Sequence, residues 1–170
     1  MLRWLGAILV AGATSAAGLA AIQRLGARVR LLSAFVTALD VMLAEITFNL
    51  TPLPELMSLL SRRSAPPARS FFLHCACLMK RLGEEPFLTL WQKAVGDMGA
   101  EWRAGERDVL MDLGAVLGRY DHKAQARAIT LAKSRMEALL ARAEGERARQ
   151  GRIFGALGAA SGLAIVIILI

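Results

Sequence analysis

The sequence predicts an all-α protein, a bundle of roughly six helices tethered by a transmembrane helix at each end. Three observations predict this architecture. Residues 4–22 and 153–170 carry no charge, and every charged residue except Arg3 lies between these two stretches. The central residues repeat apolar side chains at spacings of three and four, the period of an amphipathic helix, and no segment alternates as a half-buried strand does. Proline and glycine turn signals divide this central part into separate segments.

The two uncharged ends have the length of membrane spans, since 19 and 18 residues of α-helix rise about 30 Å, the thickness of a bilayer core. The first also has features of a secretory signal peptide, with Arg3 ahead of an apolar run and small residues at 14–17. Because its apolar run continues past those small residues into a helical pattern, we expect it to be retained. The predicted organisation is a transmembrane helix at 4–22, a helical bundle at 24–152 and a second transmembrane helix at 153–170.

Arginines flank the inner ends of both predicted spans, while the outer flanks carry only Arg3 and the chain termini. Positive residues stay in the cytoplasm, so this asymmetry predicts a multi-pass protein of the cell membrane with its central domain in the cytoplasm.

The formal net charge of +7 suits anionic lipid headgroups. Nucleic-acid binding is not expected, because the sequence has no aromatic interleaving, zinc-ligand spacing or helix-turn-helix signature. The flanking arginines are Arg24, Arg28, Arg30, Arg142, Arg147, Arg149 and Arg152.

The first central helix is expected to end at a corner that we name the elbow, residues 45–54. Pro52 and Pro54 remove two backbone donors and bias the residues before them away from the α region. Thr51 is predicted to cap the helix that follows. Glu45 lies beside the apolar stripe, where pairing with an arginine at the rim is the simplest interpretation, and the elbow is either an ordinary corner or a recognition site. The stripe consists of Leu32, Phe35, Leu39, Met42, Ile46 and Leu50.

Turn residues and apolar periodicity place five further helices after the elbow. Gly83 is expected to follow the end of the third helix, Pro86 to open the fourth, and Asp121 to cap the last. The predicted helices cover 28–50, 53–60, 68–82, 86–95, 106–117 and 121–143, with a loop at 61–67 and a looser connector at 96–105.

The fifth helix contains two Leu-Gly pairs four residues apart, which end in Gly114 and Gly118. Glycine in a helix costs about 1 kcal/mol relative to alanine, so a pair at this spacing needs a physical reason. We expect another helix to approach closely against this bare face, and Gly118 also to end the helix.

The residues offer little sign of catalysis or of a bound cofactor. His74, Cys75 and Cys77 lack the second ligand cluster that a zinc site needs, so the cysteines are interpreted as buried apolar residues in a reducing compartment. Asp108 and Asp112 are spaced to share a metal on one helix, but neighbouring arginines favour a solvated charge network. Because no phosphate-binding loop or nucleophile motif is present, we expect no enzyme, no metal, no cofactor and no small-molecule substrate.

Three parts of the sequence together carry a family resemblance. Glu45 is followed by Thr51-Pro52-Leu53-Pro54-Glu55-Leu56, and the Leu-Gly pairs are followed by Asp121 and Gln125 at fixed spacing. A glycine-rich apolar segment then ends the chain. In this combination, over essentially its full length, the sequence resembles the stage III sporulation protein AB family.

The resemblance implies a function in endospore formation. That family belongs to the channel or feeding-tube complex, built from proteins AA to AH, that joins mother cell and forespore. Its helical domain is similar to the cytoplasmic domain of the inner-membrane platform protein of type II secretion and type IV pilus systems. The expected function is therefore a non-enzymatic platform in the outer forespore membrane that faces the mother-cell cytoplasm and docks the complex's secretion-type ATPase, protein AA.

The residues of the elbow and of the Leu-Gly, Asp121 and Gln125 signature, which carry the resemblance, form the candidate partner interface. The alternative function is a membrane-surface protein that binds anionic lipid through the flanking arginines. The candidate interface residues are Glu45, Thr51, Pro52, Leu53, Pro54, Glu55, Gly114, Gly118, Asp121 and Gln125.

Overall fold

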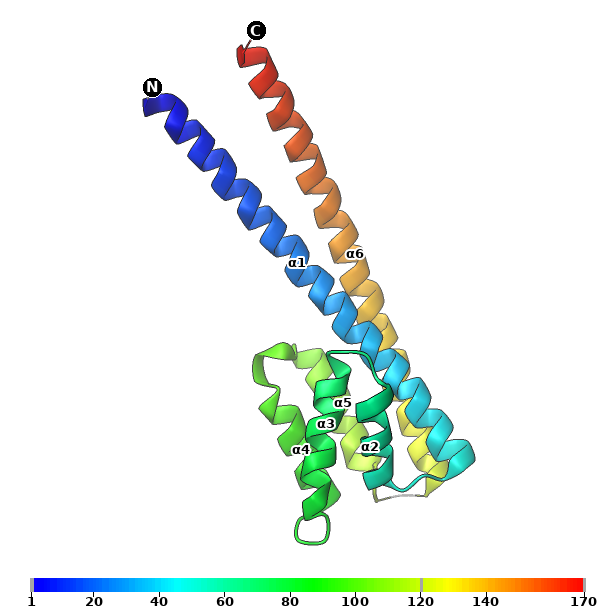
Figure 1. The fold of residues 1–170 in the computed structure, drawn as a ribbon. Coiled ribbons are helices and arrows are strands. Elements are labelled where there is room, and N and C mark those ends of the chain that lie inside the picture. The colour runs from blue at the N-terminus through cyan, green and yellow to red at the C-terminus, as the bar shows by residue number, and fades with distance from the viewer. Residues whose placement is uncertain (1, 120, 170) are drawn as a thin grey trace. The chain divides into compact units, whose positions relative to one another are not determined.

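The structure is a computed structural model that describes the backbone of residues 2–119 and 121–169, and the side chains of 23–99, 101–119 and 121–153. It is all-helical over these residues, where an isolated bridge between Leu82 and Glu85 is the sole β-type pairing, so the all-α part of the prediction is confirmed. The elements are α1 (Leu2–Ala44), the π-helical turn η1 (Glu45–Asn49), α2 (Leu53–Arg63), α3 (Ala68–Leu78), the 3₁₀ turn η2 (Met79–Arg81), α4 (Phe87–Asp97), the 3₁₀ turn η3 (Gly99–Glu101), α5 (Ala104–Val116) and α6 (His122–Leu169) (Figure 1).

The chain divides into two compact units. One comprises the helical ends, Met1–Val29 and Ala141–Ile170, and the other is the bundle, Arg30–Leu140. The backbone is helical across the predicted span 4–22 and across the described part of the other, 153–169, but their side chains lie outside the described residues, Ile153 apart.

Membrane crossing therefore stays a prediction at both ends. Among the described residues one helical segment, Gln23–Asn49, is long and apolar enough to cross a bilayer by length and composition. Of its most apolar window, 44% is buried inside the protein, and the core helix of a soluble domain passes the same test.

An aromatic cluster forms the centre of the bundle. Phe35 of α1 meets Phe71 and Phe72 of α3, with ring centroids 5.4 and 5.7 Å away. Trp102, which the sequence placed in a loose connector, is buried and stands edge-on to Phe35 at 4.8 Å. Trp91 of α4 lies edge-on to Phe71 at 5.3 Å. Edge-to-face pairs of this kind add about 0.5–1.5 kcal/mol to the burial of the rings, so the cluster fixes α1, α3 and α4 together.

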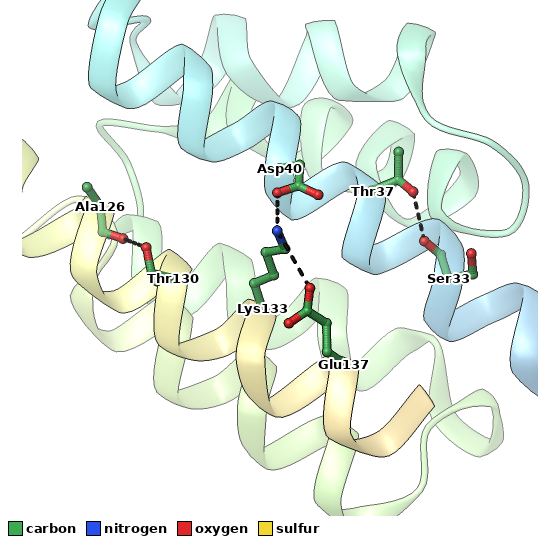
Figure 2. Close-up of polar contacts among 7 residues, drawn as sticks. All are labelled: Ser33, Thr37, Asp40, Ala126, Thr130, Lys133 and Glu137. Carbon is green, nitrogen blue, oxygen red and sulfur yellow. Dashed lines mark hydrogen bonds and ion pairs between the residues drawn. The ribbon is translucent and has the colours of Figure 1, made fainter. Parts of the chain in front are cut away.

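Within the bundle, α1 and α6 lie side by side and are joined by an ion-pair network (Figure 2). Lys133 Nζ of α6 lies 2.5 Å from Asp40 Oδ1 of α1 and 3.6 Å from Glu137 Oε1. The hydrogen bond to Asp40 is the largest cause of a raised pKa at Lys133. Beside Lys133 on the same side of α6, Ile129 and Met136 are fully buried.

Several predicted boundaries shift by one turn. The loop expected from residue 61 begins only at Ser64, because α2 continues to Arg63 before the Pro66-Pro67 pair forces the chain out of the helix. The helix expected to reach residue 82 leaves α geometry at Leu78 and tightens into η2, and Gly83 then adopts the expected positive φ of 110°.

Candidate partner interface

The elbow begins with a change of helical register. At Glu45 the chain leaves α geometry for the π-helical turn η1, and Leu50 follows in the left-handed region with φ 52°. The carbonyl of Glu45 closes this turn by accepting from the N–H of Leu50 and, at 3.3 Å, from the N–H of Thr51. A left-handed conformation costs a residue with a Cβ about 1–2 kcal/mol, so the surrounding bonds must hold Leu50 in place.

The carboxylate of Glu45 supplies much of that restraint. Its Oε2 accepts hydrogen bonds from Asn49 Nδ2 at 2.9 Å and from Thr51 Oγ1 at 2.8 Å, on either side of Leu50. The side chain is 11% exposed, and Arg63 Nη1 lies 3.9 Å from its other oxygen. The two hydrogen bonds lower the pKa of Glu45, burial opposes them, and Arg63 adds a smaller lowering. The arginine pairing that the sequence predicted is present, but the main partners are the two polar side chains of the elbow.

The predicted N-cap of α2 is wrong by one residue. The cap is Pro52, with ψ 146° and no side-chain cap, and its carbonyl accepts from the N–H of Leu56 at 2.9 Å. Thr51 does not cap because its hydroxyl donates to Glu45 instead.

The elbow also carries an open groove of about 520 Å³ on the surface of the bundle. Arg62 Nη1 donates to Ser58 Oγ at 2.9 Å, which positions one wall of this groove. Pro54 and Glu55 are exposed, so predicted interface residues are available to a partner here. The groove is lined by Thr51, Pro54, Glu55, Ser58, Leu59 and Arg62.

Two exposed apolar side chains at the elbow were missed by the sequence analysis. Phe48 is 81% exposed, and Leu50 is 54% exposed although the apolar stripe predicted it to face the core. The stripe fails at this point because the π-helical turn inserts an extra residue into the register and the left-handed Leu50 then redirects the chain. Beyond the proline break, nothing in the spacing of the stripe signals this change.

The Leu-Gly pairs meet the expectation of close approach. A Cβ on Gly114 would overlap Trp91 Cδ1 and lie 2.6 Å from Trp91 Nε1, so α5 admits the indole of α4 only at a glycine. Trp91 Nε1 donates to the carbonyl of Leu110 at 2.7 Å, which locks the ring in this position. We name this contact between Trp91, Leu110 and Gly114 the glycine joint.

Gly118, which follows α5, lies close to Leu53 of the elbow. Its φ is +80°, and a Cβ there would lie 3.3 Å from Leu53 Cδ1 and 3.3 Å from Phe87 Cβ. Gly118 thus follows the end of α5 as expected and brings together two predicted interface segments that are distant in sequence.

The remaining predicted interface residues lie at the start of α6. Asp121 is exposed and accepts from the N–H of Ala124 at 2.7 Å, which confirms the predicted cap. Gln125 is buried, and its backbone N–H donates to the carbonyl of Asp121 at 3.0 Å. Gly114 is buried too, so the outward-facing part of the predicted set is Pro52, Pro54, Glu55, Gly118 and Asp121.

The two cysteines differ in environment, and this corrects the expectation that both are buried. Cys75 is buried, and burial raises the pKa of its thiol, whereas Cys77 is exposed. His74 Nε2 lies 2.8 Å from Asp97 Oδ2, a partner that no sequence motif indicated. In the part of the chain that the structure describes, no group of three or more His, Cys, Asp or Glu side chains is placed to hold a metal ion.

Comparison with known proteins assigns the chain to a family. The family model described as Stage III sporulation protein AB matches residues 3–170. The chain belongs to the stage III sporulation protein AB family. It is 27% identical over 171 residues to the stage III sporulation protein AB of Bacillus subtilis (strain 168), a match that covers 99% of each protein.

A solved structure of a stage III sporulation protein AB (SpoIIIAB) agrees with this assignment. It superimposes with a TM-score of 0.63 at 26% identity and covers 70% of this chain and 94% of the solved one. The matching family and relatives carry sporulation names, and none of these names is that of an enzyme. The resemblance read from the elbow and the Leu-Gly pairs is therefore confirmed, and with it membership in a stage III sporulation family.

Proposed function

We propose that this protein is a non-enzymatic platform of the complex that joins mother cell and forespore, and that its elbow docks the secretion-type ATPase of that complex, stage III sporulation protein AA. It would span the outer forespore membrane with residues 24–152 in the mother-cell cytoplasm. Membership in the stage III sporulation protein AB family supports the cellular setting.

The observation that carries the docking proposal is the rigid, open elbow. Four hydrogen bonds to Glu45, two to its carbonyl and two to its carboxylate, fix residues 49–51. The groove beside them has Pro54 and Glu55 exposed on α2. A fixed surface loses little conformational entropy on binding, which favours use as a docking site over use as a flexible connection.

Capture of the purified ATPase by the full chain in detergent tests this proposal. Replacing an exposed groove residue, as in Arg62→Glu, is expected to weaken capture by about tenfold or more and to leave helicity unchanged. Arg107→Glu makes the same charge change at another exposed arginine, on α5, and is expected to bind like the unmodified protein. Failure of the unmodified chain to capture the ATPase, or equal weakening by both variants, would contradict docking at the elbow.

Cys77 provides a direct test of topology because its side chain is exposed. Cys75 is buried, and burial raises the pKa of the Cys75 thiol, so Cys75 should react little with an added reagent. A membrane-impermeant thiol reagent is expected to label the protein in opened cells and not in intact ones. Cys77→Ser is the control, since it should abolish labelling of the native protein. Labelling of intact cells would exclude a cytoplasmic bundle.

A second candidate function is binding of anionic lipid through the flanking arginines. Arg24, Arg30, Arg142 and Arg152 are exposed, and each basic residue near an anionic surface contributes about 1 kcal/mol. The measurement is the association of proteoliposomes that contain the protein with vesicles of phosphatidylglycerol, compared with liposomes that lack it. Association that needs the protein, is lost in high salt and requires no protein partner would support this alternative.

A further inference from the structure

We infer that Phe48 and Leu50 are the apolar anchors of the elbow, and that they insert into an apolar socket rimmed by carboxylates on the ATPase. This inference rests on the proposed function and names the side chains and the partner chemistry of that site. The two residues lie on the turn that joins α1 to α2, and neither belongs to the interface that the sequence predicts.

The exposure of these side chains is not explained by the fold. Phe48, at 81%, is the most exposed large hydrophobic residue among those the structure describes. Leu50 lies two residues further along the chain at 54%, so both exposed apolar side chains belong to the turn that ends the helix, and we name this pair the tip. A few large aromatic and aliphatic residues placed together on a polar surface are typical of the residues that dominate a protein–protein interface.

The backbone beneath this tip is held in one strained conformation. Leu50 has φ 52°, a conformation that glycine adopts at little cost and leucine does not. Its side chain gains little burial in return, so the benefit of a leucine must come from a contact outside the bundle. Because Asn49 and Thr51 are both bound to Glu45, the tip is also ordered before any partner arrives.

Two basic side chains are linked to other residues of the elbow. Arg63 is 66% exposed and lies 3.9 Å from the Glu45 carboxylate, and Arg62 shares the groove with Thr51. A socket that accepts the two apolar side chains and also meets these exposed guanidinium groups is complemented by carboxylates at its rim. An anionic membrane offers similar chemistry, but a fluid bilayer does not require a fixed π-helical turn or a strained leucine, so a protein socket fits these observations better.

The affinity of the full chain in detergent for the purified ATPase tests the inference. Phe48→Ala and Leu50→Gly are each expected to weaken binding by about tenfold or more. Neither should lower the unfolding temperature, since Phe48 is exposed and glycine relieves the strain at position 50. The matched controls Leu73→Ala and Leu131→Ala remove leucines of similar exposure, 55% and 54%, from α3 and α6 and should bind like the unmodified protein.

The outcomes separate this inference from the proposed function. If Arg62→Glu weakens binding while Phe48→Ala and Leu50→Gly do not, the ATPase docks in the groove and the anchors are wrong. If the unmodified chain does not bind the ATPase, the proposed function fails and the inference fails with it. If the anchor variants instead lose association with phosphatidylglycerol vesicles and keep ATPase binding, the tip inserts into lipid and the protein socket is excluded.

Discussion

The elbow and the glycine joint are both places where helices meet, but they are held by different forces. The elbow is fixed by hydrogen bonds to one partly buried carboxylate and leaves its apolar side chains in solvent. The glycine joint is fixed by contact between a fully buried indole and a bare helix face. The elbow can present side chains to a partner because polar bonds, rather than apolar burial, maintain its shape. The glycine joint has no side chain left to present, so its predicted interface residue Gly114 serves the fold.

Replacing Gly114 is the strongest way to test this contrast. In Gly114→Ala the added methyl group would overlap Trp91, so the fully buried indole, which is bound to the Leu110 carbonyl, would have to shift. We expect a loss of about 3 kcal/mol in the free energy of unfolding, measured by chemical denaturation of the full chain in detergent. Gly145→Ala is the matched control, because nothing lies near its Cβ position in α6, and it should be neutral or stabilising. Equal stability of the two variants would show that the joint adapts easily.

Gly118 lies where the two regions meet, and its replacement should have an intermediate effect. Gly118→Ala places a Cβ 3.3 Å from Leu53 and Phe87 at a φ of +80°. The left-handed conformation alone is expected to cost about 1–2 kcal/mol of unfolding free energy. Asparagine adopts the left-handed conformation more easily than alanine does. Gly118→Asn should therefore lose less unfolding free energy than Gly118→Ala, provided that the longer side chain does not clash. If alanine were harmless here, the turn would be free to adopt another conformation.

The sequence predicted the helices of both regions but not the contacts that define them. Apolar spacing correctly predicted that Leu32, Phe35 and Ile46 face the core, because regular helix geometry converts spacing directly into direction. It failed at Leu50, since the π-helical turn depends on hydrogen bonds from Asn49 and Thr51 that periodicity does not encode.

The glycine joint shows a second limit of the same kind. The cost of glycine in a helix correctly predicted a close neighbour for Gly114. Trp91 could not be identified as that neighbour, because the contact joins residues of two helices and depends on how α4 and α5 pack. For the same reason the pairing of His74 with Asp97 was not predicted.

At the elbow, removing one hydrogen bond should have a smaller effect than Gly114→Ala. Thr51→Val keeps the shape of the side chain but leaves Glu45 Oε2 with one donor fewer. We expect a loss of about 1 kcal/mol in unfolding free energy, together with weaker capture of the ATPase as residues 49–51 loosen. Thr130→Val is the control, since the Thr130 hydroxyl donates only to the Ala126 carbonyl of its own exposed helix face (Figure 2). If Thr51→Val lowers stability without affecting capture, the order of the elbow is irrelevant to docking.

The smallest expected effect is a pH dependence confined to the elbow. Hydrogen bonds from Asn49 and Thr51 lower the pKa of Glu45 below its ordinary value of 4.5, so the folded protein holds the ionised carboxylate more strongly than the unfolded chain does. The resulting stabilisation is fully present above pH 4.5 and is lost as the pH falls through the lower pKa of the folded state. Glu45→Gln has no carboxylate to protonate, so the stability difference between it and the unmodified protein should be constant above that pH and shrink below it. The measurement is the unfolding free energy of both proteins as a function of pH. The glycine joint contains no titratable group. The difference in unfolding free energy between Gly114→Ala and the unmodified protein should therefore stay constant over the same pH range. A difference for Glu45→Gln that is equally independent of pH would show that the carboxylate charge does not hold the elbow.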